Sequence, residues 1–274
     1  MLIGGILALS AVLAVLIYTA WGSLWALPLG FVGAFVLLAA LAFVFLWAAC
    51  RVVDTSKPQE KDSPFYRGMT WLYIDAILKA TRIRVHTQGL ENTPKDGRFL
   101  LVCNHTSDAD PAILLSAFPK SQLAFISKRE NKDMFLVGKL MHKLMCQLVN
   151  RENDREALKT ILKCIQLIQD DVVSIGVFPE GYIHEDRKLH HFRHGVFKIA
   201  QKAKVPIVVC TLKDTYPVFQ NARHLKPSDV YLNLLTVIPA EEVVSHTTVE
   251  LGQRIYDMMS EDLGPERVSL EENT

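Results

Sequence analysis

The sequence predicts an α/β domain with a mostly parallel sheet flanked by helices, preceded by an N-terminal transmembrane helical hairpin. Two observations lead to this fold class. Residues 1–50 contain no Asp, Glu, Lys, Arg or His, so all 30 Lys and Arg and all 29 Asp and Glu lie in residues 51–274. In that second part, short apolar runs typical of strands alternate with helical patterns, an order that favours a parallel sheet covered on its faces.

The overall composition excludes several classes of protein. A net charge of +1 provides no basic excess for binding nucleic acid. With 50% hydrophobic residues and a mean hydropathy of +0.17, the chain is too apolar for a disordered segment or an ordinary soluble enzyme. The five cysteines form no C-x-x-C pair, which disfavours a disulfide framework and a zinc ribbon and suits a reducing compartment.

The uncharged segment 1–50 is long enough for two membrane spans, since one span needs about 20 apolar residues. We expect helices over residues 2–20 and 28–50, joined by a turn that contains Gly22, Ser23 and two Trp. A cleaved signal peptide is the alternative. It would need a basic N-terminal region and a polar cleavage region, and neither is present in the sequence.

Basic residues follow the second predicted helix directly, beginning with Arg51 and Lys57. The positive-inside rule therefore places residue 51 onward in the cytoplasm. We expect a multi-pass protein of the cell membrane, with a cytoplasmic domain over residues 51–274. Its first part, residues 51–81, is a linker followed by an amphipathic helix, which lies on the membrane surface or packs on the core.

Strands and helices alternate through the remainder of the cytoplasmic domain. The expected strands cover residues 82–87, 99–103, 123–126, 172–178, 206–212 and 231–238, and the expected helices cover 111–118, 134–149, 155–169, 196–203 and 248–263. The helix over 134–149 is rich in Leu and Met, with Lys139 and Lys143 four residues apart. It is either a core helix with a solvated stripe or a second membrane-surface helix whose lysines contact anionic headgroups.

The first candidate for chemistry is the pair His105 and Asp110. His105 directly follows a predicted strand, and Asp110 begins the next helix. A carboxylate at this spacing can fix the imidazole tautomer and stabilise the protonated ring, which makes the ring a general base. The same spacing recurs at His224 and Asp229 without a strand end, and Asp110 is also a good helix cap. The attacking group would come from the substrate, because no nucleophile elbow accompanies the pair.

The second candidate is Glu180 in the sequence Phe178-Pro179-Glu180-Gly181, directly after another apolar strand. A carboxylate at the rim of the sheet can accept hydrogen bonds from a polyol, and an ordinary strand-to-turn exit is the alternative. The basic stretch that follows, over residues 184–198, suits a phosphate or is a solvated face. We expect no metal site, since the sequence lacks an H-E-x-x-H motif.

Further basic residues follow other elements. Lys128-Arg129-Glu130 comes after the third predicted strand, and Arg151 ends a helix-like segment. Together with His105 and Glu180 they place polar and basic groups where strands run out into loops, which is where sites form in such sheets.

From about residue 84 to residue 239 the sequence resembles the glycerolipid acyltransferase family, in its 1-acylglycerol-3-phosphate acyltransferase branch. Four motifs in the order and approximate spacing of that family carry the resemblance: Asn104-His105-x-x-x-x-Asp110, Lys128-Arg129-Glu130, Phe178-Pro179-Glu180-Gly181 and Val205-Pro206-Ile207-Val208. The resemblance implies that His105, paired with Asp110, deprotonates the free sn-2 hydroxyl of a lysophospholipid. That oxygen then attacks a fatty acyl thioester and gives phosphatidic acid for phospholipid biosynthesis.

The resemblance also implies the site's other components. The substrate-binding residues it suggests are Lys128, Glu130, Arg151, Glu180, Gly181 and Arg193. The expected partners are membrane lipids, the lysophospholipid acceptor, and acyl carrier protein or CoA as the thioester co-substrate. No nucleic acid, metal or other cofactor is expected.

One departure from the family affects the choice of acceptor. The third motif commonly continues Glu-Gly-Thr-Arg-Ser, whereas Ile183 stands here in place of the arginine that is implicated in phosphate binding. Either His184, Arg187 or Arg193 substitutes for it, or the acceptor is glycerol 3-phosphate or another lysolipid. A catalytically silent lipid-binding scaffold on the same fold is the alternative from another class. The intact His105 argues against the scaffold, because a binding protein needs no base.

Overall fold

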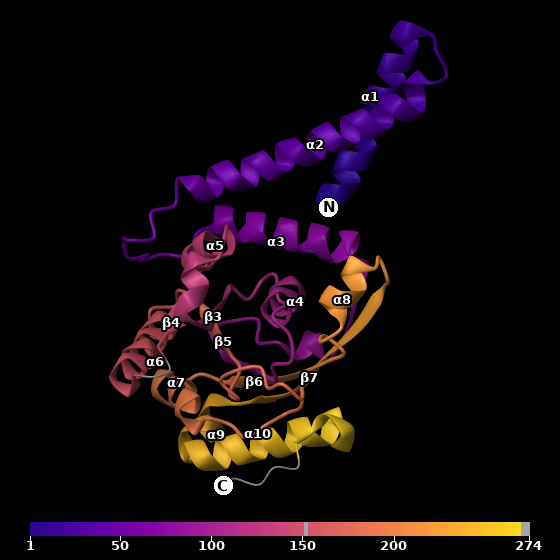
Figure 1. The fold of residues 1–274 in the computed structure, drawn as a ribbon. Coiled ribbons are helices and arrows are strands. Elements are labelled where there is room, and N and C mark those ends of the chain that lie inside the picture. Colours follow the sequence, from indigo (N-terminus) through magenta and orange to yellow (C-terminus); the bar gives the residue numbers. More distant parts are fainter. Residues whose placement is uncertain (151–152, 270–274) are drawn as a thin grey trace.

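The computed structural model describes residues 1–150 and 153–269, and it begins with two long apolar helices that form a hairpin (Figure 1). They are α1 (Leu2–Trp21) and α2 (Ala26–Arg51). Gly22 ends α1 in the left-handed region, at φ 68°. Both helices are long and apolar enough to cross a membrane, judged by length and composition. Their bounds lie within two residues of the expected ones.

The rest of the described chain is built on a seven-stranded sheet in the order β1-β7-β6-β2-β5-β3-β4. The strands are β1 (Ile83–Gln88), β2 (Leu100–Cys103), β3 (Leu123–Lys128), β4 (Gln147–Val149), β5 (Ser174–Val177), β6 (Ile207–Lys213) and β7 (Ser228–Ile238). Every neighbouring pair is parallel except β6 with β7. The predicted mostly parallel sheet is therefore confirmed, with β7 reversed beside β6.

Helices cover both faces of the sheet. One face carries α3 (Pro64–Ala80), α4 (Asp110–Ala117) and α8 (Val218–Arg223), and the other carries α6 (Asp154–Gln169), α7 (Lys198–Ala203), α9 (Ala240–Ser245) and α10 (Thr248–Leu263) (Figure 1). Short 3-10 turns cover Leu90–Asn92, Arg129–Asp133, His194–Phe197 and Pro265–Arg267. The central strand β2 is buried on both sides, since Leu100 and Val102 join one apolar cluster while Leu101 and Cys103 join the other. Such a strand is apolar throughout, as its sequence shows.

The predicted helix over residues 134–149 is wrong. The segment contains only the short helix α5 (Val137–Lys143), followed by the edge strand β4. Gly138 packs so close to the preceding turn that a Cβ there would collide with the carbonyl oxygen of Lys132. Met145, at φ 66°, then turns the chain into β4, which pairs with the end of β3. The apolar spacing of this segment therefore serves a compact turn and a strand rather than one long helix.

The hairpin rests on α3. The hydroxyls of Tyr66 and Tyr73 donate to carbonyl oxygens of α2, at 2.8 Å to Ala49 and 2.6 Å to Ala42. On its other side, α3 packs toward α4, where the indole of Trp71 donates to a backbone carbonyl. The predicted amphipathic helix thus lies between the hairpin and the α/β core (Figure 1).

Candidate active site

The parallel strands β2, β3, β5 and β6 bring their carboxyl ends to one edge of the sheet. His105 follows β2, Phe178 follows β5 and Lys128 ends β3. Ligands of open α/β sheets bind at this edge, because the strands end there and the loops that follow can separate. The residues that the sequence singled out therefore arise from one edge of the fold.

The side chains of His105 and Asp110 are paired, as predicted. The ring Nδ1 lies 2.9 Å from Asp110 Oδ2, and the carboxylate is fully buried. The same oxygen accepts the backbone N–H groups of Thr106 and Ser107, at 2.8 and 2.9 Å. Asp110 thus closes the turn before α4 and orients the imidazole at the same time. Among the described residues, Nε2 of His105 has no hydrogen-bond partner, so this nitrogen is free to accept a proton from a substrate.

Aromatic stacking also fixes the plane of the imidazole. The ring of Phe178 lies parallel to that of His105, with 4.0 Å between centroids, and Phe125 stacks on the far side of Phe178 at 5.7 Å. Gly176 of β5 makes room for this column of rings, because a Cβ there would collide with the ring of Phe125. Through these stacked rings, the sheet restrains the orientation of the His105 imidazole.

Glu180 lies beneath the site rather than at its rim. Its side chain is buried, and its two carboxylate oxygens accept the backbone N–H groups of His105 and His190, at 2.7 and 3.1 Å. Burial raises the pKa of this carboxyl to about 8, although the two amide donors act in the opposite direction. The predicted contact of Glu180 with a polyol stays a prediction, and in this structure backbone donors occupy both oxygens. Glu180 thus joins the loop after β5 to the loop after β2.

Gly181 and Arg193 form one unit. Gly181 has φ 88°, a conformation that favours glycine, and a Cβ there would lie 2.9 Å from Nε of Arg193. The backbone N–H of Arg193 donates to the carbonyl of Pro179 at 2.8 Å. The long side chain of Arg193 therefore crosses over the turn after β5, and its exposed position leaves it accessible to an anion.

A cavity of about 170 Å³ lies between the ends of β2 and β6, and the residues before and after His105, Asn104 and Thr106, form part of its lining. Thr106 and Arg187 line it, and Nη1 of Arg187 donates to the carbonyl of Thr106 at 3.2 Å. The guanidinium also lies 4.7 Å from the ring centroid of Tyr216, while its buried Nε has no partner among the described residues. The other cations of this cavity, Lys213 and Arg267, are paired with carboxylates. Arg187 is thus the cation here that the protein leaves without an acidic partner, within the part of the chain that is described.

Comparison with known proteins agrees with this geometry. A family model described as Acyltransferase matches residues 84–213. A probable 1-acyl-sn-glycerol-3-phosphate acyltransferase of Mycoplasma pneumoniae is 34% identical over 184 residues, which cover 65% of this chain and 66% of that protein. Both matches show that the chain is similar to acyltransferases over the segment that contains the His105–Asp110 pair. The human 1-acyl-sn-glycerol-3-phosphate acyltransferase alpha is 24% identical, over 65% of this chain and 62% of its own.

The crystal structure of the 1-acyl-sn-glycerophosphate acyltransferase PlsC from Thermotoga maritima has the same fold. It superimposes with a TM-score of 0.61 at 22% sequence identity, over 81% of this chain and 88% of that chain. The matches to the two Mycoplasma relatives span just under two thirds of those proteins' own lengths.

Two further predicted site residues lie at the end of another strand. Lys128 and Glu130 are exposed at the end of β3 and in the turn that follows it. Their neighbour Arg129 pairs with Glu156 of α6 at 3.6 Å. The described structure contains no hydrogen bond or ion pair between Lys128 or Glu130 and His105. Arg151 lies outside the described residues, so its predicted role stays a prediction.

The sequence offered three residues in place of the missing arginine, and one of them, Arg187, is hydrogen-bonded to the loop that carries His105. Its guanidinium touches the residue that follows His105. His184 instead stacks on His190, with 3.5 Å between ring centroids, and Arg193 covers Gly181. The sequence carried no signal for the part that Thr106 and Tyr216 play, because neither residue belongs to a motif.

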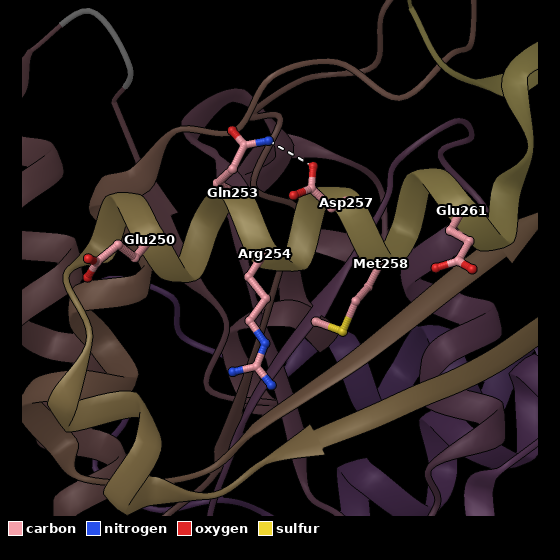
Figure 2. A pocket seen from close by; sticks show the side chains of 6 residues that line it. All are labelled: Glu250, Gln253, Arg254, Asp257, Met258 and Glu261. Carbon is pink, nitrogen blue, oxygen red and sulfur yellow. Dashed lines mark hydrogen bonds between the residues drawn. The ribbon is translucent and has the colours of Figure 1, made fainter.

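A second, shallow depression lies on α10, and Figure 2 shows that its lining comes from one face of that helix. Gln253 and Asp257 are joined there by a hydrogen bond of 2.8 Å. No titratable pair of the catalytic kind lines it among the described residues, and it lies on the sheet face opposite α3 and α4. Within residues 1–150 and 153–269, no group of three or more His, Cys, Asp or Glu side chains is placed to hold a metal ion.

Proposed function

We propose that the chain transfers a fatty acyl group from a thioester to the free sn-2 hydroxyl of 1-acylglycerol 3-phosphate, giving phosphatidic acid. The observation that carries this proposal is the His105–Asp110 pair, in which Nδ1 is held at 2.9 Å and Nε2 has no partner among the described residues. The match of residues 84–213 to the family model described as Acyltransferase supports the reaction class. The names of the relatives support the acceptor.

The reaction needs one base and a correctly placed thioester. Nε2 of His105 takes the proton of the acceptor hydroxyl as the oxygen attacks the thioester carbonyl. An ester C–O bond forms, the C–S bond breaks, and the leaving thiolate receives the proton from the imidazolium. Asp110 stabilises the charged ring between these steps. General base catalysis of this kind contributes about 10²–10⁴-fold, and the remaining acceleration comes from positioning.

The phosphate of the acceptor would bind to the cations around the catalytic edge. Arg187, which lines the cavity next to the loop of His105, and the exposed Arg193 are the best placed of these, with Lys128 at the end of β3 as a further contact. A guanidinium binds phosphate well because its fixed donors match the phosphate oxygens. Arg187 then compensates for the arginine that Ile183 replaces.

The α1–α2 hairpin would hold this site at the bilayer, where acceptor and product both reside. We propose that residues 1–50 form a membrane anchor of two spans and that residues 51–274 form the catalytic domain on the cytoplasmic face. The basic residues Arg51, Lys57 and Lys61, which follow α2, support this orientation by the positive-inside rule. The thioester donor is acyl carrier protein or CoA, and both are cytoplasmic. The reaction written above requires no other cofactor.

The test is acyl transfer by the purified full chain in lipid vesicles, with donors and acceptors varied separately. We expect phosphatidic acid from 1-acylglycerol 3-phosphate with at least one of the two thioesters. The replacement of the family's arginine by Ile183 favours one second candidate, an acyltransferase for glycerol 3-phosphate or another lysolipid. Product from those acceptors alone would select that candidate, and no product from any acceptor would leave the lipid-binding scaffold.

A further inference from the structure

Three large apolar side chains project into solvent at the start of α5. Met134, Phe135 and Val137 are 49%, 69% and 43% exposed, and we call these three residues the apolar tip. Single exposed apolar residues are common on protein surfaces, but adjacent large ones on a short loop indicate a surface that binds something apolar. We therefore ask which apolar partner covers the apolar tip.

The backbone of the tip is shaped to present these side chains. Leu136, between them, has φ 59°, a left-handed conformation that a bulky residue rarely adopts. As a result Leu136 turns inward while its neighbours turn outward. Leu136 and Leu140 pack on the cluster formed by Leu46 and Cys50 of α2 with Met69 of α3.

This packing places the apolar tip beside the last turns of α2, and so sets its depth along the axis of that helix. The 26 residues of α2 extend about 39 Å at 1.5 Å per residue, whereas the hydrocarbon core of a bilayer is about 30 Å thick. The last turns of α2, which carry Leu46 and Cys50, therefore emerge in the headgroup region. A segment that packs on those turns lies at the same depth, beside the lipid.

The charges around the tip suit an anionic lipid surface. Lys139 and Lys143 of α5 donate to the linker after α2, at 3.0 Å each to Val53 and Gln59. Arg51 at the end of α2 and Lys132 before the tip are exposed, and one exposed acid, Asp133, lies between Lys132 and Met134. Apolar side chains flanked by basic ones are typical of segments that insert into the headgroup region. The occupant that fits is a lipid bilayer.

We propose that the apolar tip inserts into the bilayer interface as a second membrane contact, separate from the hairpin. The 3-10 turn Arg129–Asp133 connects it directly to the end of β3, so this contact holds the catalytic edge of the sheet against the surface that contains the lipid acceptor. The inference rests on the proposed membrane location of the hairpin, and it assigns the orientation of the site on the membrane.

The test measures depth rather than activity. The native cysteines are buried or half-buried, so a polarity-sensitive fluorophore can be attached to Phe135→Cys in the full chain. Val249→Cys is the matched control, because Val249 is 57% exposed on α10, on the opposite side of the sheet (Figure 1). In vesicles of phosphatidylglycerol and phosphatidylcholine, we expect lipids brominated near the headgroup to quench the label at 135 but not the label at 249.

Two outcomes would overturn the proposal. Equal quenching of both labels by aqueous iodide would show that the tip stays in water. Protection from iodide without quenching by brominated lipid, rising with protein density, would show that a second copy of the chain covers the tip. Both measurements stand even if the protein transfers no acyl group, so failure here is distinct from failure of the proposed function.

A second variant connects the tip to the reaction. We expect Met134→Ser with Phe135→Ser to lower the rate severalfold on long-chain lysolipid in vesicles and to leave unchanged the rate on a water-soluble, short-chain acceptor. Val249→Ser should change neither rate. Equal losses on both acceptors would indicate damage to the fold and would contradict a role at the membrane.

Discussion

At the scale of single residues, the proposed base His105 is held from three directions. Asp110 fixes Nδ1, Phe178 fixes the ring plane, and Glu180 holds the backbone N–H. The first contact was predictable from the sequence, because His105 follows a strand and Asp110, five positions later, begins a helix, so that the turn between them brings the two side chains together. The contact of Glu180 was not predictable, since it joins residues 75 positions apart and depends on β5 lying beside β2.

The buried carboxyl of Glu180 predicts a specific dependence of stability on pH. Its pKa is raised from 4.5 to about 8, so between these values the native state holds a proton that the unfolded chain has lost. The free energy of unfolding therefore falls as pH rises through this window, by up to about 1.4 kcal/mol per pH unit. Glu180→Gln cannot titrate. We expect the wild-type Tm, measured relative to that variant in detergent, to fall between pH 5 and pH 8; a constant difference would show that Glu180 is ionised throughout.

Arg187 predicts a change in acceptor binding. A lost hydrogen bond to a charged group costs about 1.5–3 kcal/mol, so Arg187→Ala should raise KM for 1-acylglycerol 3-phosphate about tenfold or more and change kcat little. Arg254→Ala on α10, which removes a cation paired with Glu242, is the control and should leave KM unchanged. Steady-state kinetics in mixed micelles would measure both. A shift of KM below twofold for Arg187→Ala would place the phosphate elsewhere.

At the scale of elements, Gly176 of β5 leaves space for the ring of Phe125 in the column that ends at His105. Gly176→Ala would drive a methyl group into the ring of Phe125 and disturb the column that ends at His105. Overpacking of this kind costs about 1–3 kcal/mol. We expect a Tm several degrees lower together with reduced kcat. Gly68→Ala in α3 has no heavy atom near the new methyl group and should leave Tm equal or raised, as helix propensity favours alanine. A wild-type Tm for Gly176→Ala would contradict this packing.

The elements also show which parts of the fold the apolar sequence pattern could predict and which it could not. Strands buried on both faces, such as β2, are continuous apolar runs with clear limits, and α10 was predicted at its observed bounds, Thr248–Leu263. Residues 134–149 are equally apolar, yet they form a tip, the short helix α5 and the edge strand β4. Periodicity cannot separate these outcomes, because the close approach of Gly138 to Lys132 and the pairing of β4 with β3 are tertiary contacts.

At the scale of the whole molecule, the hairpin and the α/β core are separable in their packing. The two large apolar clusters of the core contain no residue from 1–50, whereas α3 contacts both parts. We therefore expect a fragment of residues 51–274 to retain a cooperative thermal transition and its sheet. The same fragment exposes the face of α3 around Met69 and keeps the apolar tip, so it should float with anionic vesicles. A fragment that is unfolded by circular dichroism would show that the hairpin is part of the core.

The most direct test of the account compares His105→Ala with His224→Ala in the acyl-transfer assay. Both histidines have an aspartate five residues on, but Asp229 pairs with His86 rather than with His224. Only His105 therefore sits in a hydrogen-bonded catalytic pair. We predict that His105→Ala has the wild-type Tm but forms phosphatidic acid about 10²-fold or more slowly than the wild type. We predict that His224→Ala keeps wild-type activity. Equal activity of the two variants would contradict the role of His105 as the base.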